Sequence, residues 1–199
     1  MPFPVARTRD EAHLYLDLHP CDVCGSVETT WRHGIVLAEG APVGRYAGTC
    51  AGCGNAREHL FALPEREVVP VGYPTFGGPE PSRLLDAGEW LWVADLTARN
   101  VPADDPAEER RALAIAVAAV DEIVKFLGPG DEAVPERAFW SERGRRERDA
   151  EPARFTRDRL LSLREDYRDR LSGHRPGPSP EAGGAPEAGG APERREEGD

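Results

Sequence analysis

Two short cysteine motifs constrain this chain more than any other feature of its sequence. Each has the form C-x-x-C-G, and together they hold the chain's four cysteines, Cys21, Cys24, Cys50 and Cys53. Two thiolates three positions apart can bind one metal ion from a single tight turn, and zinc takes four such ligands in a tetrahedron. The glycine that follows each motif, Gly25 or Gly54, permits the positive φ that such a turn needs. The spacing therefore predicts one Zn²⁺ ion per chain, held by all four cysteines.

The same cysteines leave three other interpretations open: an iron site, a redox-active dithiol, or four unrelated thiols. Rubredoxins also use paired C-x-x-C-G motifs for iron, but they usually carry proline where this chain has Ala51. A thioredoxin-type dithiol would precede a helix in a βαβ unit, a pattern that this sequence lacks. A site closed by four thiolates has no open coordination position, so we expect a structural ion and not a catalytic one.

Three histidines lie in or beside the segment that carries the cysteine motifs, namely His19, His33 and His59. Any of them could replace a cysteine as a metal ligand, or donate a hydrogen bond to a ligand sulfur. We expect ordinary strand or turn residues instead. Substitution of each cysteine by serine separates the interpretations, because a histidine ligand would leave one cysteine dispensable.

The segments around the cysteines predict a small β-structure. Leucines alternate along 12–18, which predicts a half-buried strand. Further strands are expected at 27–38, as one strand or a bent pair interrupted at Gly34, and at 44–49 and 57–63, with a turn at 39–42. This order of strands and cysteine motifs over residues 10–69 resembles the zinc ribbons. The resemblance implies a three- or four-stranded antiparallel unit with the metal at one end, and it names no particular activity.

A loop at 70–81 contains four prolines and three glycines. It is either a boundary between modules or an extended strip laid over the ribbon. Tyr73 and Phe76 favour the strip, because a free linker seldom carries two aromatic side chains.

The second half of the chain has helical patterns. Asp86 and Glu89 have the spacing of a capping box ahead of an apolar run, which predicts a helix. A clearer helix follows, with Asp105 at the N-cap, Pro106 at the first helical position and Gly128 just past the end. This helix is apolar on more than one side, so we expect it at the centre of the core or in a subunit contact.

Two more helices are expected at 135–147 and 155–171, the second of them amphipathic. From Gly173 onward the composition is mainly glycine, proline, alanine and glutamate, which predicts a disordered acidic tail. The predicted fold class is α+β, an antiparallel zinc ribbon packed against three or four helices. The expected domains are a ribbon module at 1–69, a connector at 70–81, a helical segment at 82–172 and the tail at 173–199.

Two clusters in the helical half could form binding surfaces. Five aromatic residues could make a docking surface, although core positions are the better expectation: Trp90, Trp92, Phe139, Trp140 and Tyr167. Four arginines could contact RNA or phosphate: Arg143, Arg145, Arg146 and Arg148. Residues 131–175 contain 12 basic and 11 acidic groups, so we expect these arginines to form a solvated helix face.

The charge of the chain and the motifs that it lacks make several classes of function less favoured. The formal net charge is -11, and residues 1–69 hold 6 basic and 9 acidic groups, which disfavours nucleic-acid binding. Met1 to Asp10 has no apolar signal-peptide core, and no apolar run approaches the ~20 residues of a membrane helix. We therefore expect a cytoplasmic location without membrane contact, where thiols remain reduced. None of the common catalytic or phosphate-binding motifs occurs.

The leading hypothesis is a non-enzymatic, zinc-binding bacterial protein that binds another protein. An inhibitor or immunity-type partner of a basic toxin or enzyme is one concrete version, because acidity steers association with basic partners. The alternative is a nucleic-acid-associated regulatory zinc ribbon that uses the arginine cluster. A third hypothesis is an enzyme with a site assembled from dispersed residues such as His33, His59 and Asp95. Homo-oligomerisation is left open.

Overall fold

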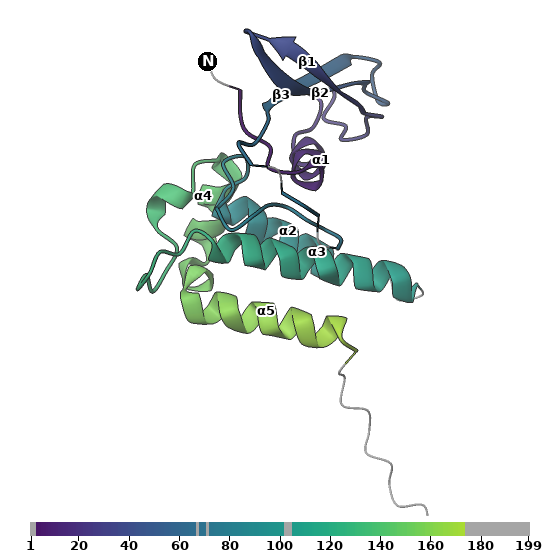
Figure 1. The fold of residues 1–199 in the computed structure, drawn as a ribbon. Coiled ribbons are helices and arrows are strands. Elements are labelled where there is room, and N and C mark those ends of the chain that lie inside the picture. The colour runs from purple at the N-terminus through teal and green to yellow at the C-terminus, as the bar shows by residue number, and fades with distance from the viewer. Residues whose placement is uncertain (1–2, 67, 71, 102–104, 174–199) are drawn as a thin grey trace, which may run out of the picture.

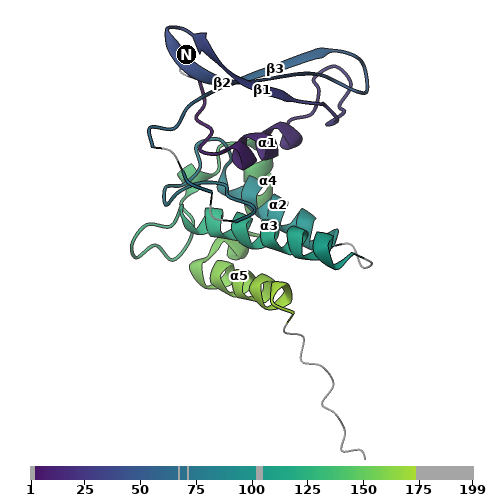
Figure 2. The same cartoon turned by 45° about the vertical axis from the view of Figure 1, so that its right-hand side comes forward.

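The computed structural model describes residues 3–66, 68–70, 72–101 and 105–173, and these residues form the predicted α+β fold. A three-stranded antiparallel sheet lies at one end, a helix lies directly against it, and the remaining helices are stacked in layers below (Figure 1). The same layers are seen from a second direction in Figure 2. Except for Gly173, the predicted disordered tail at 173–199 lies outside the described residues.

The sheet consists of β1 (Arg32–Ala38), β2 (Ala41–Thr49) and β3 (Ala56–Ala62), in that order. A two-residue turn joins β1 to β2, and Glu39 (φ 52°) and Gly40 (φ 81°) both adopt the left-handed conformation that such turns favour. The predicted turn was therefore in the right place but too long, since β2 begins at Ala41. The loop between β2 and β3 lies at the opposite end of the sheet and carries the second cysteine motif.

The segment predicted as a strand at 12–18 is instead part of a helix, α1 (Arg9–Leu18). Thr8 caps its N-terminus, where the hydroxyl accepts a hydrogen bond of 3.1 Å from the backbone N–H of Glu11. The prediction was wrong because it weighed the alternating leucines and overlooked this Thr-x-x-Glu spacing.

The alternating leucines are explained by the position of α1 between two layers. Leu16 is fully buried on the sheet side, in a cluster with Tyr46 and Phe61. Leu14 and Leu18 pack against the core of the helical half. A helix that is covered on both sides needs apolar residues on two opposite faces. Residues two positions apart in a helix lie on nearly opposite faces, so the apolar residues alternate as they do in a strand.

The two predicted helix starts are confirmed. In α2 (Ala87–Arg99) the Asp86–Glu89 capping box is complete, and Asp105 caps α3 (Pro106–Val124). α3 ends at Val124, before the predicted stop at Gly128, because the next backbone hydrogen bonds span three residues instead of four. α3 packs between α2 and α5 (Arg157–Leu171), so it is the central helix of this half.

The predicted helix at 135–147 is divided into a short 3₁₀ turn, η1 (Glu136–Ala138), and α4 (Glu142–Ala150). A second 3₁₀ turn, η2 (Pro152–Phe155), precedes α5. Of the five aromatic residues considered as a docking surface, three are buried in the helical core, namely Trp90, Phe139 and Tyr167. For these three the core interpretation is confirmed.

The connector at 70–81 packs against the molecule, as the strip interpretation expects, but not over the sheet. Phe76 is buried with its ring centroid 4.9 Å from that of Trp90 in the helical core. The backbone N–H of Thr75 donates to Asp10 at 2.8 Å, which fixes the connector to the start of α1. The sheet is instead attached to the helices through α1.

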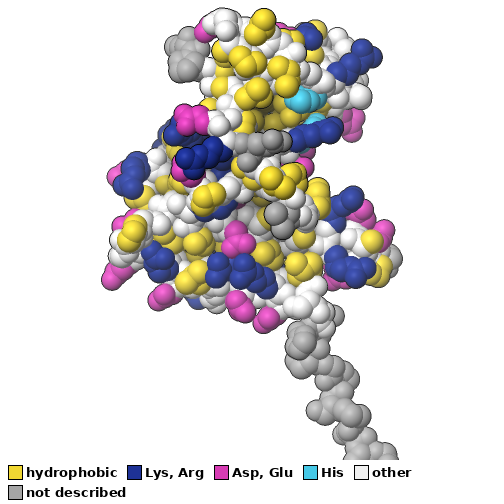
Figure 3. Space-filling view, in the orientation of Figure 1, with side chains coloured by type: hydrophobic (Ala, Val, Ile, Leu, Met, Phe, Trp, Pro, Cys, Tyr) yellow, Lys and Arg dark blue, Asp and Glu magenta, His cyan; other side chains and the backbone are white. Residues whose placement is uncertain are grey.

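The surface differs between the two ends of the molecule. Acidic and basic side chains alternate over the helical half, whereas hydrophobic side chains gather over the sheet (Figure 3). None of the described helices combines the length and the apolarity needed to cross a membrane.

Candidate metal centre

The structure brings the four cysteines together at the end of the sheet that is remote from the β1–β2 turn. Their Sγ atoms all lie within 4.8 Å of one another. Two of the separations are 3.7 Å, from Cys21 to Cys53, and 3.5 Å, from Cys24 to Cys50. A tetrahedral zinc ion with Zn–S bonds of about 2.3 Å requires sulfurs about 3.8 Å apart. The distances between the sulfurs thus fit the binding of one metal ion, and none of the cysteines forms a disulfide.

The two cysteine motifs have the same backbone geometry. The N–H of Gly25 donates to the carbonyl of Cys21 at 2.8 Å, and the N–H of Gly54 donates to the carbonyl of Cys50 at 2.9 Å. Both glycines have positive φ, 75° and 73°, as the sequence predicts. Each motif is therefore a turn closed by a hydrogen bond that spans four positions of the sequence.

The site has a buried side and an exposed side. Cys21 and Cys50 are buried, whereas Cys24 and Cys53 are exposed. The backbone N–H of Val23 donates to Cys21 and lowers the pKa of its thiol, an effect that burial opposes. Burial also raises the pKa of Cys50, but hydrogen bonds from the backbone N–H groups of Cys53 and Gly52 outweigh it and lower this pKa to about 6. The two buried thiols thus favour the thiolate form that metals bind. Cys53 does not, because a backbone hydrogen bond at Asn55, which lowers its pKa, is outweighed by the neighbouring thiols and by burial, which raise that pKa to about 12.

None of the three candidate histidines belongs to this cluster in the described part of the chain. The His19 ring stacks on Tyr15 with ring centroids 3.8 Å apart, and the His33 ring packs against Tyr46 with centroids 4.7 Å apart. His59 lies beside Trp31, with ring centroids 5.5 Å apart. All three histidines pack against aromatic side chains of the sheet or α1, as expected for structural residues that bind no metal.

The residue that sequence reasoning missed is Arg57 on β3. Its side chain is buried with the residue 8% exposed, and it donates to Thr29 Oγ1 at 2.9 Å and to the carbonyl of His19. Thr29 forms a β-bridge with Cys50, and His19 lies two residues before Cys21. Arg57 therefore connects the backbones that carry the two cysteine motifs. No local pattern marks it, because its role depends on the packing of three separate segments.

Two acidic residues, Asp22 and Glu58, line the same small pocket as Arg57, but neither forms an ion pair with it in the described part of the chain. The guanidinium stacks over Trp31 at 4.9 Å, and within the described residues it forms no ion pair. A buried cation without an anionic partner is unfavourable, so a negative group near it would stabilise this arrangement.

The other residues considered for function remain apart. Asp95 belongs to α2, where Arg154 holds it through hydrogen bonds of 2.7 and 2.8 Å, whereas His33 and His59 are on the sheet. The structure therefore does not assemble the dispersed catalytic site.

The four arginines of α4 are each engaged locally. Arg143 stacks on Trp92 at 4.2 Å, and Arg145 donates to the carbonyl of Trp140. Carboxylates of the same helix or its neighbours pair with the other two: Arg146 with Glu142, and Arg148 with Asp149 and Glu136. This cluster is a locally paired helix face, as expected.

Comparisons of the chain with protein-family models, with curated proteins and with solved structures find no match. The residues and their geometry are therefore the whole basis for a functional assignment.

Proposed function

We propose that this protein is a zinc-binding, non-enzymatic interaction module in which the four cysteines hold one structural Zn²⁺ ion. The Sγ separations of 3.5 and 3.7 Å fit a zinc tetrahedron, and four thiolates leave no position for a substrate. The metal supplies the stability that a three-stranded sheet of this size lacks.

Arg57 supports the choice of a four-thiolate centre. Four thiolates and one Zn²⁺ carry a formal charge of -2, and such a centre would supply the negative charge that the buried guanidinium otherwise lacks. A site of mixed histidine and cysteine ligands would carry less negative charge and leave the guanidinium less compensated.

The observation that carries the interaction role is the outer edge of β1. β1 is an end strand of the sheet, and on its free side it pairs with no other described segment. Residues 33–38 include no charged residue and no proline, and Ile35 and Leu37 are 64% and 81% exposed. Apart from Arg32 at its start, β1 thus lacks the charges and prolines that protect end strands, and such an edge is a template for a further strand. The opposite edge, on β3, is partly covered, because Val5 forms a bridge with Ala62.

We infer that a strand from another protein binds along β1. The net charge of -11 opposes pairing between two copies of this chain and favours a basic partner. An inhibitor or immunity-type role toward a basic toxin or enzyme fits these features. The nucleic-acid alternative has less support, because the arginines of α4 are engaged with their own neighbours.

The test compares capture of partners from native cells by three versions of the protein. Ile35→Lys with Leu37→Lys places two charges on the exposed edge without touching the core, and this variant should lose a partner that the wild type retains after nuclease treatment. Val69→Lys is the matched control, because Val69 is 74% exposed and lies outside the sheet. High salt should weaken the complex.

Two results would contradict the proposal. One is an edge variant that still captures the same partner as the wild type. The other is a stable dimer of the wild type in light scattering that the edge variant abolishes, because the edge would then serve a second copy. Proteins lost on nuclease treatment would instead favour the nucleic-acid alternative.

A further inference from the structure

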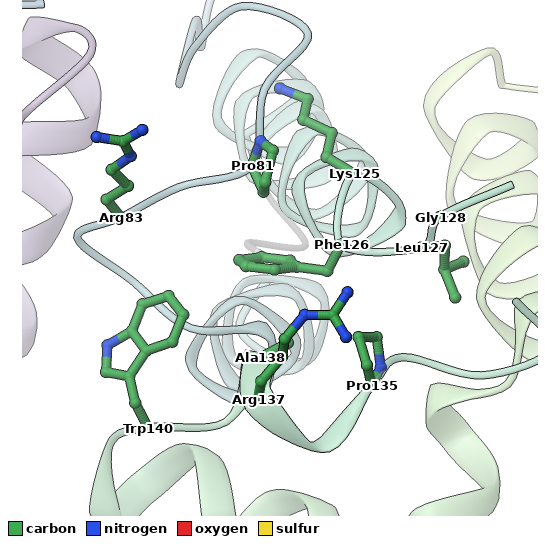
Figure 4. Close-up of a pocket in the computed structure, with 10 residues that line it drawn as sticks. All are labelled: Pro81, Arg83, Lys125, Phe126, Leu127, Gly128, Pro135, Arg137, Ala138 and Trp140. Atoms are coloured by element: carbon green, nitrogen blue, oxygen red, sulfur yellow. The ribbon is translucent and has the colours of Figure 1, made fainter.

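The helical half contains a pocket that neither the metal centre nor the β1 edge uses. It has a volume of about 650 Å³, which lies in the range of small-molecule sites. The end of α3, the η1 turn and the chain before α2 form its walls (Figure 4). It is therefore built from segments that are far apart in the sequence.

The charge of this pocket is opposite to that of the whole chain. Its lining includes three basic side chains, Arg83, Lys125 and Arg137, and no acidic one. Lys125 is partly neutralised, since it pairs with Glu122 at 2.5 Å. Arg83 and Arg137 are exposed, and neither forms an ion pair with a described carboxylate. In a chain with a net charge of -11, such a pocket is a local site of positive potential.

The remaining lining is apolar and includes two aromatic rings. Phe126 and Trp140 lie with centroids 6.0 Å apart and planes inclined by 60°. Trp140 is 43% exposed, although the other aromatic residues of this half are largely buried. Figure 4 shows the guanidinium of Arg137 between Phe126 and Pro135, with Arg83 and Lys125 farther out on either side of Pro81. A cationic group and aromatic surfaces are thus available to the same ligand.

We propose that this pocket binds a small organic anion that carries a flat apolar ring. The ring would pack against Phe126 and Trp140, and its carboxylate or phosphate would accept hydrogen bonds from Arg137, with Arg83 adding positive charge at the rim. Arginine suits this role because its planar group binds carboxylate and phosphate through two parallel hydrogen bonds. This site is separate from the metal centre, so either can fail without affecting the other.

Two probes of the same shape test the proposal by titration calorimetry on the full chain. 2-Naphthoate supplies a ring and an anionic group, and 2-naphthamide supplies the ring without the charge. We expect 2-naphthoate to bind with one molecule per chain and about tenfold more tightly than 2-naphthamide, which corresponds to one charge-assisted hydrogen bond.

Variants then locate the binding site. Arg137→Gln should remove the preference for the anionic probe, and Trp140→Ala should weaken both probes. Arg32→Gln removes one positive charge from the sheet and should change neither affinity. Because Arg137 and Trp140 are exposed, these variants should fold, and circular dichroism checks this. Equal affinity for the two probes would overturn the proposal, as would an affinity for 2-naphthoate that survives both Arg137→Gln and Arg83→Gln.

Discussion

Arg7 and Glu122 form an ion pair of 2.8 Å across 115 positions of the sequence. The same guanidinium binds Glu11 on α1 at 2.7 Å, and the side chains of Glu11 and Glu122 are only 0% and 4% exposed. Burial alone would lower the pKa of Arg7, but these two carboxylates raise it. One arginine thus joins the start of the chain to α1 and to the central helix α3, and its two ion pairs fix α1 to the helical half.

Arg7→Met should therefore lower the free energy of unfolding by about 3–5 kcal/mol, because it leaves the fully buried Glu11 without a cationic partner and leaves Glu122 with Lys125 alone. Glu122→Gln should cost less, since Arg7 keeps Glu11 as a partner. The exposed pair of Arg45 and Glu58 provides the control, and Arg45→Gln should cost less than about 1 kcal/mol. Urea denaturation measures all three, and equal costs for Arg7→Met and Arg45→Gln would contradict this account.

Asp86 caps α2 and also binds the backbone of Ser141, the residue that caps α4. Its Oδ1 accepts from the N–H groups of Gly88 and Glu89 at the start of α2, and its Oδ2 accepts from the N–H of Ser141 before α4 at 2.7 Å. Asp86→Ala should destabilise the protein by about 2–4 kcal/mol, twice the effect of an ordinary cap. Asp105→Ala is the matched control, since Asp105 is an exposed cap of α3 alone, and it should cost about 1 kcal/mol. Thermal unfolding that ranks the two variants equally would argue against a contribution from the bond between Asp86 and Ser141.

Glu89 should make stability depend on pH. Burial first, and then the neighbouring Asp86, raise the pKa of Glu89 above its usual value of 4.5. The folded protein therefore keeps this proton over a range of pH in which the unfolded chain has lost it. Its contribution to stability is complete below about pH 4.5 and declines as pH rises through the folded pKa.

Glu89→Gln keeps the capping interaction and removes this titration. The stability of the wild type relative to this variant should fall as pH rises from 4.5, as measured by urea denaturation over a pH series. Glu108→Gln, at the equivalent position of the exposed α3 start, provides the control. A difference between wild type and Glu89→Gln that stays constant with pH would contradict the prediction.

The parts of this structure that could be predicted from sequence are those that depend on neighbouring residues. The cysteine motifs and the caps at Asp86 and Asp105 are local, because their hydrogen bonds span a few positions. For the same reason, α1 could have been found from Thr8 and Glu11. The strand interpretation was wrong because a helix buried on two sides also carries alternating apolar residues. The sequence of 12–18 alone does not distinguish such a helix from a strand.

The parts that could not be predicted depend on contacts between distant segments. Glu122 has the sequence context of a solvated helix residue, and only the fold places it beside Arg7. In the sequence, Arg57 is one charged residue of a strand, and its contacts with Thr29 and His19 are visible only in the folded structure. Arg83 and Arg137 likewise line one pocket only because the fold brings the chain before α2 close to η1.

Metal analysis of the full chain, purified under reducing conditions without chelators, tests the central claim most directly. The account predicts one zinc ion per chain, loss of that zinc in each of four variants (Cys21→Ser, Cys24→Ser, Cys50→Ser and Cys53→Ser), and full retention in His59→Ala. Each cysteine substitution should also lower the thermal stability of the protein, because metal binding contributes to folding. A protein without bound metal, a protein that binds iron, or a cysteine variant that keeps a full zinc ion would contradict it.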